Sequence, residues 1–278
     1  KGRYIWCDGI FDCHICDGVI DIKTDAAVEL CDGFENLHGA YLAASKKHFP
    51  FDTSMPDILF WSAPQYNTWM ELGTEQTTEN ILEYARGIKS NGLPSGILMI
   101  DGGWQEDYGV YEYFNQRKIP DPKALVDELH GLGFKVMVWV SPIVSSAGTR
   151  YKELRDRGYL VSGTDGEPVV RKWWSGYSAV LDFSNPDAVA WMREKLNSLM
   201  VNYGVDGFKF DAGDRYFYDD DDITYGKVCA RDQTALFNAV GEVYRFNEFR
   251  AAWKFGGRPI VARLHDKYHS WDSFGINT

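Results

Sequence analysis

Residues 207–214, Gly-Phe-Lys-Phe-Asp-Ala-Gly-Asp, place a carboxylate at the C-terminal end of a short apolar strand, just before a glycine. The preceding segment, residues 186–203, is typical of a helix that begins after Ser184 or Asn185. A helix, a short loop and a strand that ends in an acid form the repeating unit of a β/α barrel, in which the C-terminal strand ends carry the chemistry. The octapeptide therefore predicts a barrel and puts Asp211 on its functional face.

A lysine precedes this carboxylate by two positions. Because successive side chains alternate across a strand, Lys209 and Asp211 point to the same side. A cation beside a carboxylate keeps the carboxylate ionised, which suits Asp211 to act as a nucleophile. A structural ion pair inside the barrel is the alternative, and this stretch alone leaves both interpretations open.

Size and composition fit a globular domain of barrel size. The chain has 278 residues, 45% of them hydrophobic and 25% charged, which is enough for a full barrel of ~250 residues with a large core. The aromatic content of 15% suits sugar-binding walls, and it suits a core equally well. A net charge of −11 disfavours nucleic acid and anionic membranes as partners.

The chain offers no targeting or membrane signal. It has no stretch of ~20 apolar residues, so we expect a soluble protein with no membrane partner. The first residues, Lys1-Gly2-Arg3-Tyr4, do not resemble a signal peptide and look like a cut inside a longer chain. The oligomeric state and the compartment stay open at this point.

Strand and helix signals alternate along most of the chain. Residues 1–50 predict the tail of an N-terminal β domain plus a linking helix, and residues 51–278 predict a catalytic barrel. N-terminal strands are predicted at 4–7, 12–16, 19–23 and 27–30, and a helix at 36–47. Barrel strands are predicted at 65–72, 96–102, 134–142, 207–211 and 258–264, helices at 78–91, 122–132, 150–158, 186–203 and 232–249, and an irregular insertion at 160–183. Five parallel strands are too few to close a barrel, so the predicted class is α/β, a (β/α)8 TIM-barrel type that is incomplete at the C-terminus.

Two clusters suggest metal binding at first sight. Cys13-His14-Ile15-Cys16 has a zinc or redox spacing, but zinc needs a second ligand pair, and Cys7 and Cys31 are loosely placed for one. Antiparallel strands in which cysteine is a small apolar residue fit the pattern better. The four aspartates at 219–222 favour a solvated loop over a calcium site. We expect no metal and no organic cofactor, and the lack of a glycine-rich phosphate loop disfavours a nicotinamide or phosphate enzyme.

Several acids follow the predicted strands, namely Glu71, Asp101, Asp211 and Asp266. Acids gathered at one barrel mouth indicate a glycosidase, since retaining hydrolysis needs two carboxyls about 5–5.5 Å apart. Asp266 lies between Arg263 and Lys267 and could alternate between acid and base. An acid on a surface loop is the alternative for Asp266.

Three passages resemble glycoside hydrolase family 31, the retaining α-glycosidases, over nearly the whole chain. They are PQYNTWMEL at 64–72 with GILMIDGGWQEDYGVYEYFNQRKIPDPKALVDELHGLGFKVMVWVSP at 96–142, then LDFSNPDAVAWMREKL and YGVDGFKFDAGD within 181–214, and RPIVARLHDKYHSWD at 258–272. The resemblance is strongest to the branch that contains the myogenesis-regulating glycosidase and bacterial α-galactosidases. It implies a barrel enzyme that cleaves terminal α-linked sugars without a cofactor.

At matching positions the resemblance implies Asp211 as the nucleophile and Asp266 as the acid/base, with Trp271 at a tryptophan that the family usually places just beyond the acid/base. It also implies that Lys209 and Arg263 contact sugar hydroxyls near the nucleophile.

Further substrate contacts are implied for Asp101 and Trp104, which would line the −1 subsite and read the outer hydroxyls. Trp69 and Trp139 would form walls of the pocket, although tryptophans in strands can equally belong to the core.

The chain departs from the family pattern in ways that leave the sugar open. Many relatives carry two acids at the second strand end, where this chain has Asp101 followed by Gly102 and Gly103. A shorter stretch before Asp266 favours the galactosidase-like branch over typical α-glucosidases. The predicted function is a retaining α-glycosidase of galactosidase or glucosidase type acting on an oligosaccharide or glycoside. The alternative is a catalytically silent carbohydrate-binding or truncated barrel protein.

Overall fold

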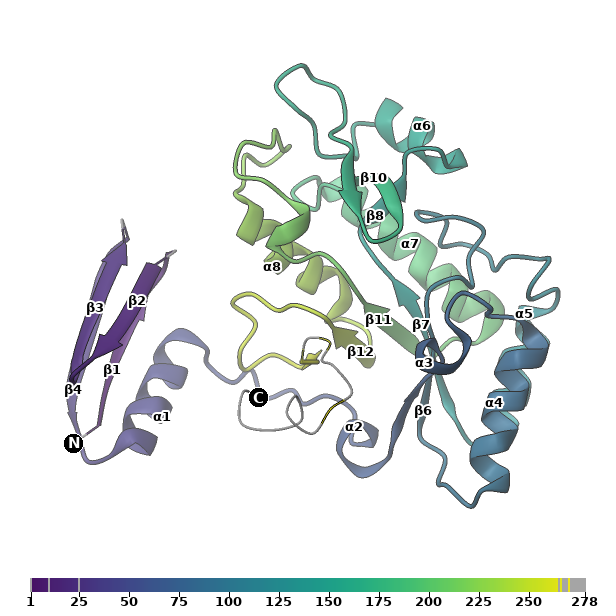
Figure 1. Cartoon of the computed structure of the whole chain (residues 1–278), viewed down its shortest axis with the longest axis horizontal. Helices are drawn as coiled ribbons and strands as arrows, with labels where there is room; N and C mark the ends of the chain where they lie inside the picture. Colours follow the sequence, from purple (N-terminus) through teal and green to yellow (C-terminus); the bar gives the residue numbers. More distant parts are fainter. Residues whose placement is uncertain (1, 10, 25, 265, 267–269, 271–278) are drawn as a thin grey trace. The chain divides into compact units, whose positions relative to one another are not determined.

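The computed structural model describes residues 2–9, 11–24, 26–264, 266 and 270 (Figure 1). These residues form two compact units. The first comprises the described residues up to Ser54 together with Gly256–Arg258, and the second comprises Met55–Phe255 with the described residues from Pro259 onward. Among all the described residues of both units, no helix is both long and apolar enough to cross a bilayer.

Two antiparallel strand pairs and one helix make up the first unit. β1 (Gly2–Cys7) pairs with β4 (Val28–Phe34), and β2 (Phe11–Cys16) pairs with β3 (Val19–Thr24). Asp17 and Gly18 join β2 to β3, and both have positive φ, as a two-residue hairpin turn requires. α1 (Leu37–His48) begins after Asn36, whose side chain accepts an amide hydrogen bond from the first turn. The predicted strands and helix of this segment are confirmed.

The cysteines of this unit are free thiols with ordinary surroundings. Cys13 and Cys16 are exposed on β2, while the Cys31 thiol donates to a Glu29 carboxylate oxygen at 3.0 Å. Among the described residues, no group of three or more His, Cys, Asp or Glu side chains is arranged to hold a metal ion.

A curled parallel sheet is the core of the second unit, as Figure 1 shows. Its strand order is β13 (Val261–Ala262), β12 (Phe246–Phe249), β11 (Gly207–Phe210), β7 (Lys135–Val140), β6 (Ile97–Ile100) and β5 (Gln65–Asn67). The helices between these strands are α4 (Thr78–Ser90), α5 (Pro122–Gly131), α6 (Thr149–Asp156), α7 (Pro186–Tyr203) and α8 (Ala230–Gly241). Parallel strands joined through helices are the arrangement of an incomplete (β/α)8 barrel, which confirms the predicted fold class.

Because side chains alternate along each strand, this sheet has one face that packs against the helices and one inner face. Phe208, Phe210 and their equivalents on neighbouring strands pack into the main core with the helices. The opposite positions form a small apolar layer at the N-terminal ends, made of Ile97, Met99, Met137 and Phe246 with Leu59 and Phe60 of α2 (Leu59–Ser62). Above that layer, Lys209 stands in register with Trp139 on one side and Glu248 on the other. The inner face therefore changes from apolar to charged toward the C-terminal strand ends.

The segment 65–72 differs from the single strand that the sequence predicts. β5 ends at Asn67, and a short helix, α3 (Trp69–Leu72), follows at once. The Asn67 side-chain oxygen accepts a hydrogen bond from the Trp69 amide at 2.8 Å, which turns the chain out of the strand. Glu71 consequently lies on a helix and is not a strand-end acid.

The segment 232–249 also differs from its prediction as one helix. α8 ends at Gly241, and Phe246–Phe249 forms β12, which pairs with β11 over its whole length. A Cβ at Gly241 would lie 2.4 Å from the Phe210 ring, so this glycine marks close packing of the helix end on the sheet. Tertiary pairing decides the conformation of β12, because its four residues carry no strong strand signal.

The insertion at 160–183 is more regular than predicted. β9 (Arg171–Trp173) and β10 (Gly176–Val180) form a hairpin that joins β8 (Ile143–Ser145) in a small antiparallel sheet. The acidic loop at 219–222 follows a 3-10 turn, Arg215–Phe217, and Asp222 forms an ion pair with Arg171 of β9. That loop therefore holds the hairpin instead of being wholly solvated.

A substitution at Gly207 tests how closely β11 and β12 approach each other. A Cβ at this position would lie 1.9 Å from the Phe246 carbonyl oxygen. Because a backbone atom cannot move aside as a flexible side chain can, we expect Gly207→Ala to lower the free energy of unfolding by about 2 kcal/mol or more. The shift of the urea midpoint measures this change.

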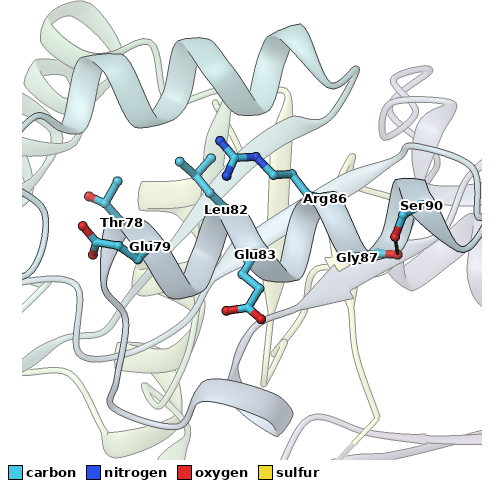
Figure 2. Close-up of a pocket in the computed structure, with 7 residues that line it drawn as sticks. All are labelled: Thr78, Glu79, Leu82, Glu83, Arg86, Gly87 and Ser90. Atoms are coloured by element: carbon cyan, nitrogen blue, oxygen red, sulfur yellow. Dashed lines mark hydrogen bonds between the residues drawn. The ribbon is translucent and has the colours of Figure 1, made fainter.

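Gly87→Ala is the matched control. Gly87 lies on the shallow groove of α4 in Figure 2, and apart from its chain neighbours and the backbone of its own helix no atom lies within 4 Å of a Cβ placed there. Alanine favours a helix interior over glycine by about 0.5–1 kcal/mol, so this variant should be more stable than the parent chain. Equal destabilisation by both substitutions would contradict the account of the β11–β12 contact.

Candidate active site

A cavity of about 690 Å³ opens at the C-terminal ends of the parallel strands. The side chains of the strand ends, of α3 and of the β9–β10 hairpin surround it: Trp69, Met70, Asp101, Gly102, Tyr108, Trp139, Trp174, Ser175, Lys209, Asp211, Arg250, Arg263 and Asp266. Of the nine residues that the sequence predicts for the site, seven line this cavity. Trp104 does not line it, and Trp271 lies outside the described residues.

Asp211 stands at the centre of this arrangement, directly after β11. Its Oδ2 accepts a hydrogen bond from the Trp139 indole N–H at 2.9 Å, and its Oδ1 accepts one from the Ala212 amide at 2.9 Å. Ala212 has a φ of 54°, in the left-handed region that residues with a Cβ rarely adopt. Together with Gly213, at φ 74°, it turns the chain sharply and aims the carboxylate into the cavity.

The surroundings of Asp211 keep this carboxyl ionised. Burial alone would raise its pKa, because the charged form loses water. The charge of Lys209, the two hydrogen bonds and the charge of Arg263 outweigh that cost and hold the pKa below its ordinary value. The carboxylate is therefore ready to act as a nucleophile without first losing a proton.

Lys209 does not form its short contact with Asp211. Its Nζ donates to Asp101 Oδ2 at 2.6 Å, and both side chains are almost fully buried. Asp101 Oδ2 also accepts a hydrogen bond from the Asn67 side-chain amide at 2.8 Å, and Asp101 Oδ1 accepts one from the Gly102 amide at 2.8 Å. Asp101 is thus fixed by three donors, one from β5, one from β11 and one from the residue that follows it, and it presents a rigid edge to the cavity.

One guanidinium lies between the two carboxyls that the sequence assigns to catalysis. Arg263 donates to Asp266 Oδ1 through Nη1 at 2.8 Å, and its Nη2 lies 3.4 Å from Asp211 Oδ1. Arg250 lies nearby, with its Nη1 3.6 Å from Asp211 Oδ1 and 3.7 Å from Asp266 Oδ2. The two acids differ in environment, because the side chain of Asp211 is 10% exposed and that of Asp266 is 79% exposed.

Tryptophans form the walls of the cavity. Trp69 on α3 and Trp174 on the hairpin are half exposed, whereas Trp139 is 3% exposed and serves Asp211 as a hydrogen-bond donor. Trp174 also lies over the Arg250 guanidinium, 5.2 Å from its ring centroid. The insertion therefore contributes one wall of a site that the barrel strands build.

Trp104 lies outside the cavity lining, so the structure does not place it where the expected direct contact with a sugar would occur. Its side chain is fully buried and packs against Phe114, and its indole N–H donates to the Trp139 carbonyl oxygen at 2.8 Å. Its place is behind the wall, where it supports the strand that carries Trp139.

Arg250 and Trp174, which line the cavity, and Glu248, which lies beside it, are among the residues that the sequence did not predict for the site. Glu248 lies on β12, inside the stretch 232–249 that the sequence pattern assigned to a helix, and Arg250 follows directly after it. Glu248-Phe249-Arg250 repeats the charged-aromatic-charged pattern of Lys209-Phe210-Asp211 on the neighbouring strand. This repeat was the sequence signal that could have identified β12 as a strand of the site. Trp174 gave no such signal, because its position depends on how the hairpin folds.

Comparison with known families agrees with this geometry. A model of the glycosyl hydrolases family 31 TIM-barrel domain matches residues 65–261, from the start of β5 to the first residue of β13. The match covers well over half of the chain, so the chain belongs to glycosyl hydrolase family 31. Asp101, Lys209, Asp211 and Arg250 lie inside the matched range, and Arg263 and Asp266 follow directly after it.

The similar curated proteins are glycosidases. The myogenesis-regulating glycosidase of Mus musculus is 30% identical over 181 residues, which are 65% of this chain and 25% of that protein. The α-xylosidase XylQ of Lactiplantibacillus pentosus is 31% identical over 161 residues, 56% of this chain and 20% of the relative. The 1,3-α-isomaltosidase of Kribbella flavida is 33% identical over 152 residues, 44% and 21% of the two chains. The chain thus spans about a quarter or a fifth of the length of these relatives.

Solved structures share the fold. The cycloalternan-forming enzyme from Listeria monocytogenes, in complex with a pentasaccharide substrate, superimposes with a TM-score of 0.77 over 98% of this chain and 30% of its own, at 17% identity. A dextranase from Flavobacterium johnsoniae, complexed with glucose, gives a TM-score of 0.66 over 75% of this chain and 28% of its own, at 22% identity.

The Trp139 hydrogen bond makes a prediction about Asp211. A carboxyl with a lowered pKa in the fold contributes stability above its unfolded pKa, about 3.9, and loses it as the pH falls through its folded pKa. Trp139→Phe removes the indole donor, so the Asp211 pKa should rise and acid unfolding should begin at a higher pH. An NMR titration of the Asp211 carboxyl carbon measures the first effect, and a circular dichroism pH series measures the second.

Trp61→Phe controls for the loss of an indole. Trp61 lies on α2 and is 63% exposed, away from the cavity lining. The Asp211 titration should be unchanged in this variant. An unchanged titration in Trp139→Phe as well would show that the indole does not hold the carboxylate in its charged form.

Proposed function

We propose that the chain carries the active site of a retaining α-glycosidase, with Asp211 as nucleophile and Asp266 as acid/base. The single observation that carries the proposal is the guanidinium of Arg263 between a buried ionised carboxylate and an exposed carboxyl at one cavity mouth. The contacts of Arg263 with both acids bring them to one cavity mouth, as a reaction that uses two carboxyls requires. Retention is proposed from membership in family 31, whose glycosidases are retaining enzymes. The two environments also suit the two roles, since only the exposed acid can reach both solvent and a leaving group.

The reaction follows from these positions. In the first step Asp266 donates a proton to the glycosidic oxygen, the bond from that oxygen to the anomeric carbon breaks, and an Asp211 oxygen forms an ester with that carbon. In the second step Asp266 takes a proton from water, the water oxygen attacks the same carbon, and the ester bond breaks to restore Asp211. No metal or organic cofactor enters either step.

The walls of the cavity suit a sugar. Trp69 and Trp174 offer apolar faces, while Asp101 and Lys209 present fixed polar atoms that can select hydroxyl positions. Similar proteins include α-xylosidases and a lysosomal α-glucosidase of Mus musculus, which supports a terminal α-linked sugar as the substrate class. The preference for galactose or glucose stays a prediction, and xylose joins them as a candidate.

Turnover of chromogenic glycosides tests the proposal. We expect the chain to release p-nitrophenol from at least one of the α-xyloside, α-glucoside and α-galactoside, with the sugar first appearing as the α-anomer by proton NMR. Asp211→Asn should abolish release, because an amide cannot form the ester. Asp127→Asn, which changes the same atoms in a surface ion pair of α5 with Lys123, should retain full activity.

Two results would contradict the assignment. Asp211→Asn with activity close to that of the parent chain would remove Asp211 from the reaction. First appearance of the β-anomer would show inversion. Sugar binding without any release would favour the alternative of a catalytically silent barrel.

A further inference from the structure

Glu248 is a buried acid next to the site that the proposed reaction does not use. It lies on β12, where it pairs with Lys209 of β11 and Val261 of β13. Its residue is 6% exposed, and it is not among the residues that line the cavity. A carboxyl buried at this depth needs partners of opposite charge, and its neighbours supply them.

Arg263 is the neighbour that connects Glu248 to the reaction. The Arg263 Nε lies 3.8 Å from Glu248 Oε1, is buried, and has no hydrogen-bond partner among the described residues. The other two nitrogens of the same guanidinium face Asp211 and Asp266. Three acids therefore hold three sides of one planar cation.

We propose that Glu248 is a positioning residue that holds the Arg263 guanidinium between Asp211 and Asp266, and so keeps the Asp211 carboxylate free to attack. The inference rests on the proposed function. In the proposed reaction, Glu248 contacts neither the sugar nor the reacting atoms and acts only through Arg263.

The geometry shows why such a hold matters. Arg263 Nη2 lies 3.4 Å from Asp211 Oδ1, longer than the 2.7–2.9 Å of a close charge-assisted hydrogen bond. Without the attraction of Glu248, the guanidinium can move closer to Asp211 and form that bond. A carboxylate bound so tightly is a weaker nucleophile, because its charge is already stabilised in the ground state.

The charges around Glu248 also give it a pH dependence of its own. Burial raises its pKa above the ordinary glutamate value; Asp101 and Asp211 add to the rise, and Lys209 and Arg263 oppose it. The pKa of Asp211 is shifted in the opposite direction. As the pH falls, Glu248 is therefore protonated before Asp211, and its neutral carboxyl keeps an oxygen that can accept from the Arg263 Nε while the nucleophile is still charged.

A pair of substitutions separates the roles of charge and shape. Glu248→Ala removes the partner of Arg263, and we expect kcat to fall about tenfold to a hundredfold with little change in KM, as for a misplaced group beside the reacting centre. Glu248→Gln keeps an oxygen that can accept from the Arg263 Nε, so it should restore most of the lost kcat. The acid side of the pH profile of kcat/KM should stay close to the parent's in Glu248→Gln, because a protonated glutamate offers the Arg263 Nε the same neutral oxygen.

Glu83 supplies matched controls for both changes. It projects from the outer face of α4, as Figure 2 shows, and it is exposed. Glu83→Ala and Glu83→Gln should leave kcat, KM and the pH profile unchanged.

A second measurement does not depend on turnover. The Nε–H signal of Arg263 in nitrogen-15 NMR reports how firmly its guanidinium is held, and we expect faster hydrogen exchange in Glu248→Ala and near-parent exchange in Glu248→Gln. If the parent chain releases no sugar, the proposed function fails, and this signal still decides whether Glu248 positions Arg263. An Arg263 signal that is unchanged in Glu248→Ala, or a kcat within about twofold of the parent, would overturn the inference.

Discussion

A buried, ionised carboxylate is the constraint on which the rest of this structure depends. An unpaired charge at the depth of Asp211 would cost several kcal/mol, so the fold must surround it with donors and cations. They come from separate elements: the indole of Trp139 from β7, the charge of Lys209 from β11, and the guanidinium of Arg263 from beyond β13. Only the parallel arrangement of the sheet brings these strand ends together, which ties the chemistry to the fold.

The cations are in turn held by other acids. Asp101 takes the short contact with Lys209, and Asp266 and Glu248 share Arg263. Each cation therefore stands between two or more carboxyls and is not bound exclusively by the nucleophile. This sharing reconciles two opposite demands on Asp211, since the carboxylate must stay charged and must also stay free enough to form a bond. A site with a single tight ion pair would meet the first demand and fail the second.

Much of this could be predicted from the sequence because it follows from local patterns. The barrel class, the helix that begins after Asn185 and the placement of Lys209 and Asp211 on the same side of β11 follow from side-chain alternation and helix capping, and these were confirmed. The strand β12 could not be predicted, because its conformation comes from pairing with β11 and not from its own four residues. With β12 missed, Glu248 and Arg250 were missed too. Trp104 was misplaced for a related reason, since sequence cannot distinguish a tryptophan that lines a cavity from one directly behind it.

The central claim is that Asp211 forms a covalent bond with the sugar, and trapping tests it most directly. Incubation with the 5-fluoro-α-glycosyl fluorides of xylose, glucose and galactose should slow the second step and let the glycosyl-enzyme accumulate. Peptide mapping by mass spectrometry should then find one sugar per chain on the peptide that contains residues 207–214, with Asp211 as the modified side chain. A labelled chain whose sugar is attached to another carboxylate, or steady sugar release with no covalent adduct, would contradict the account.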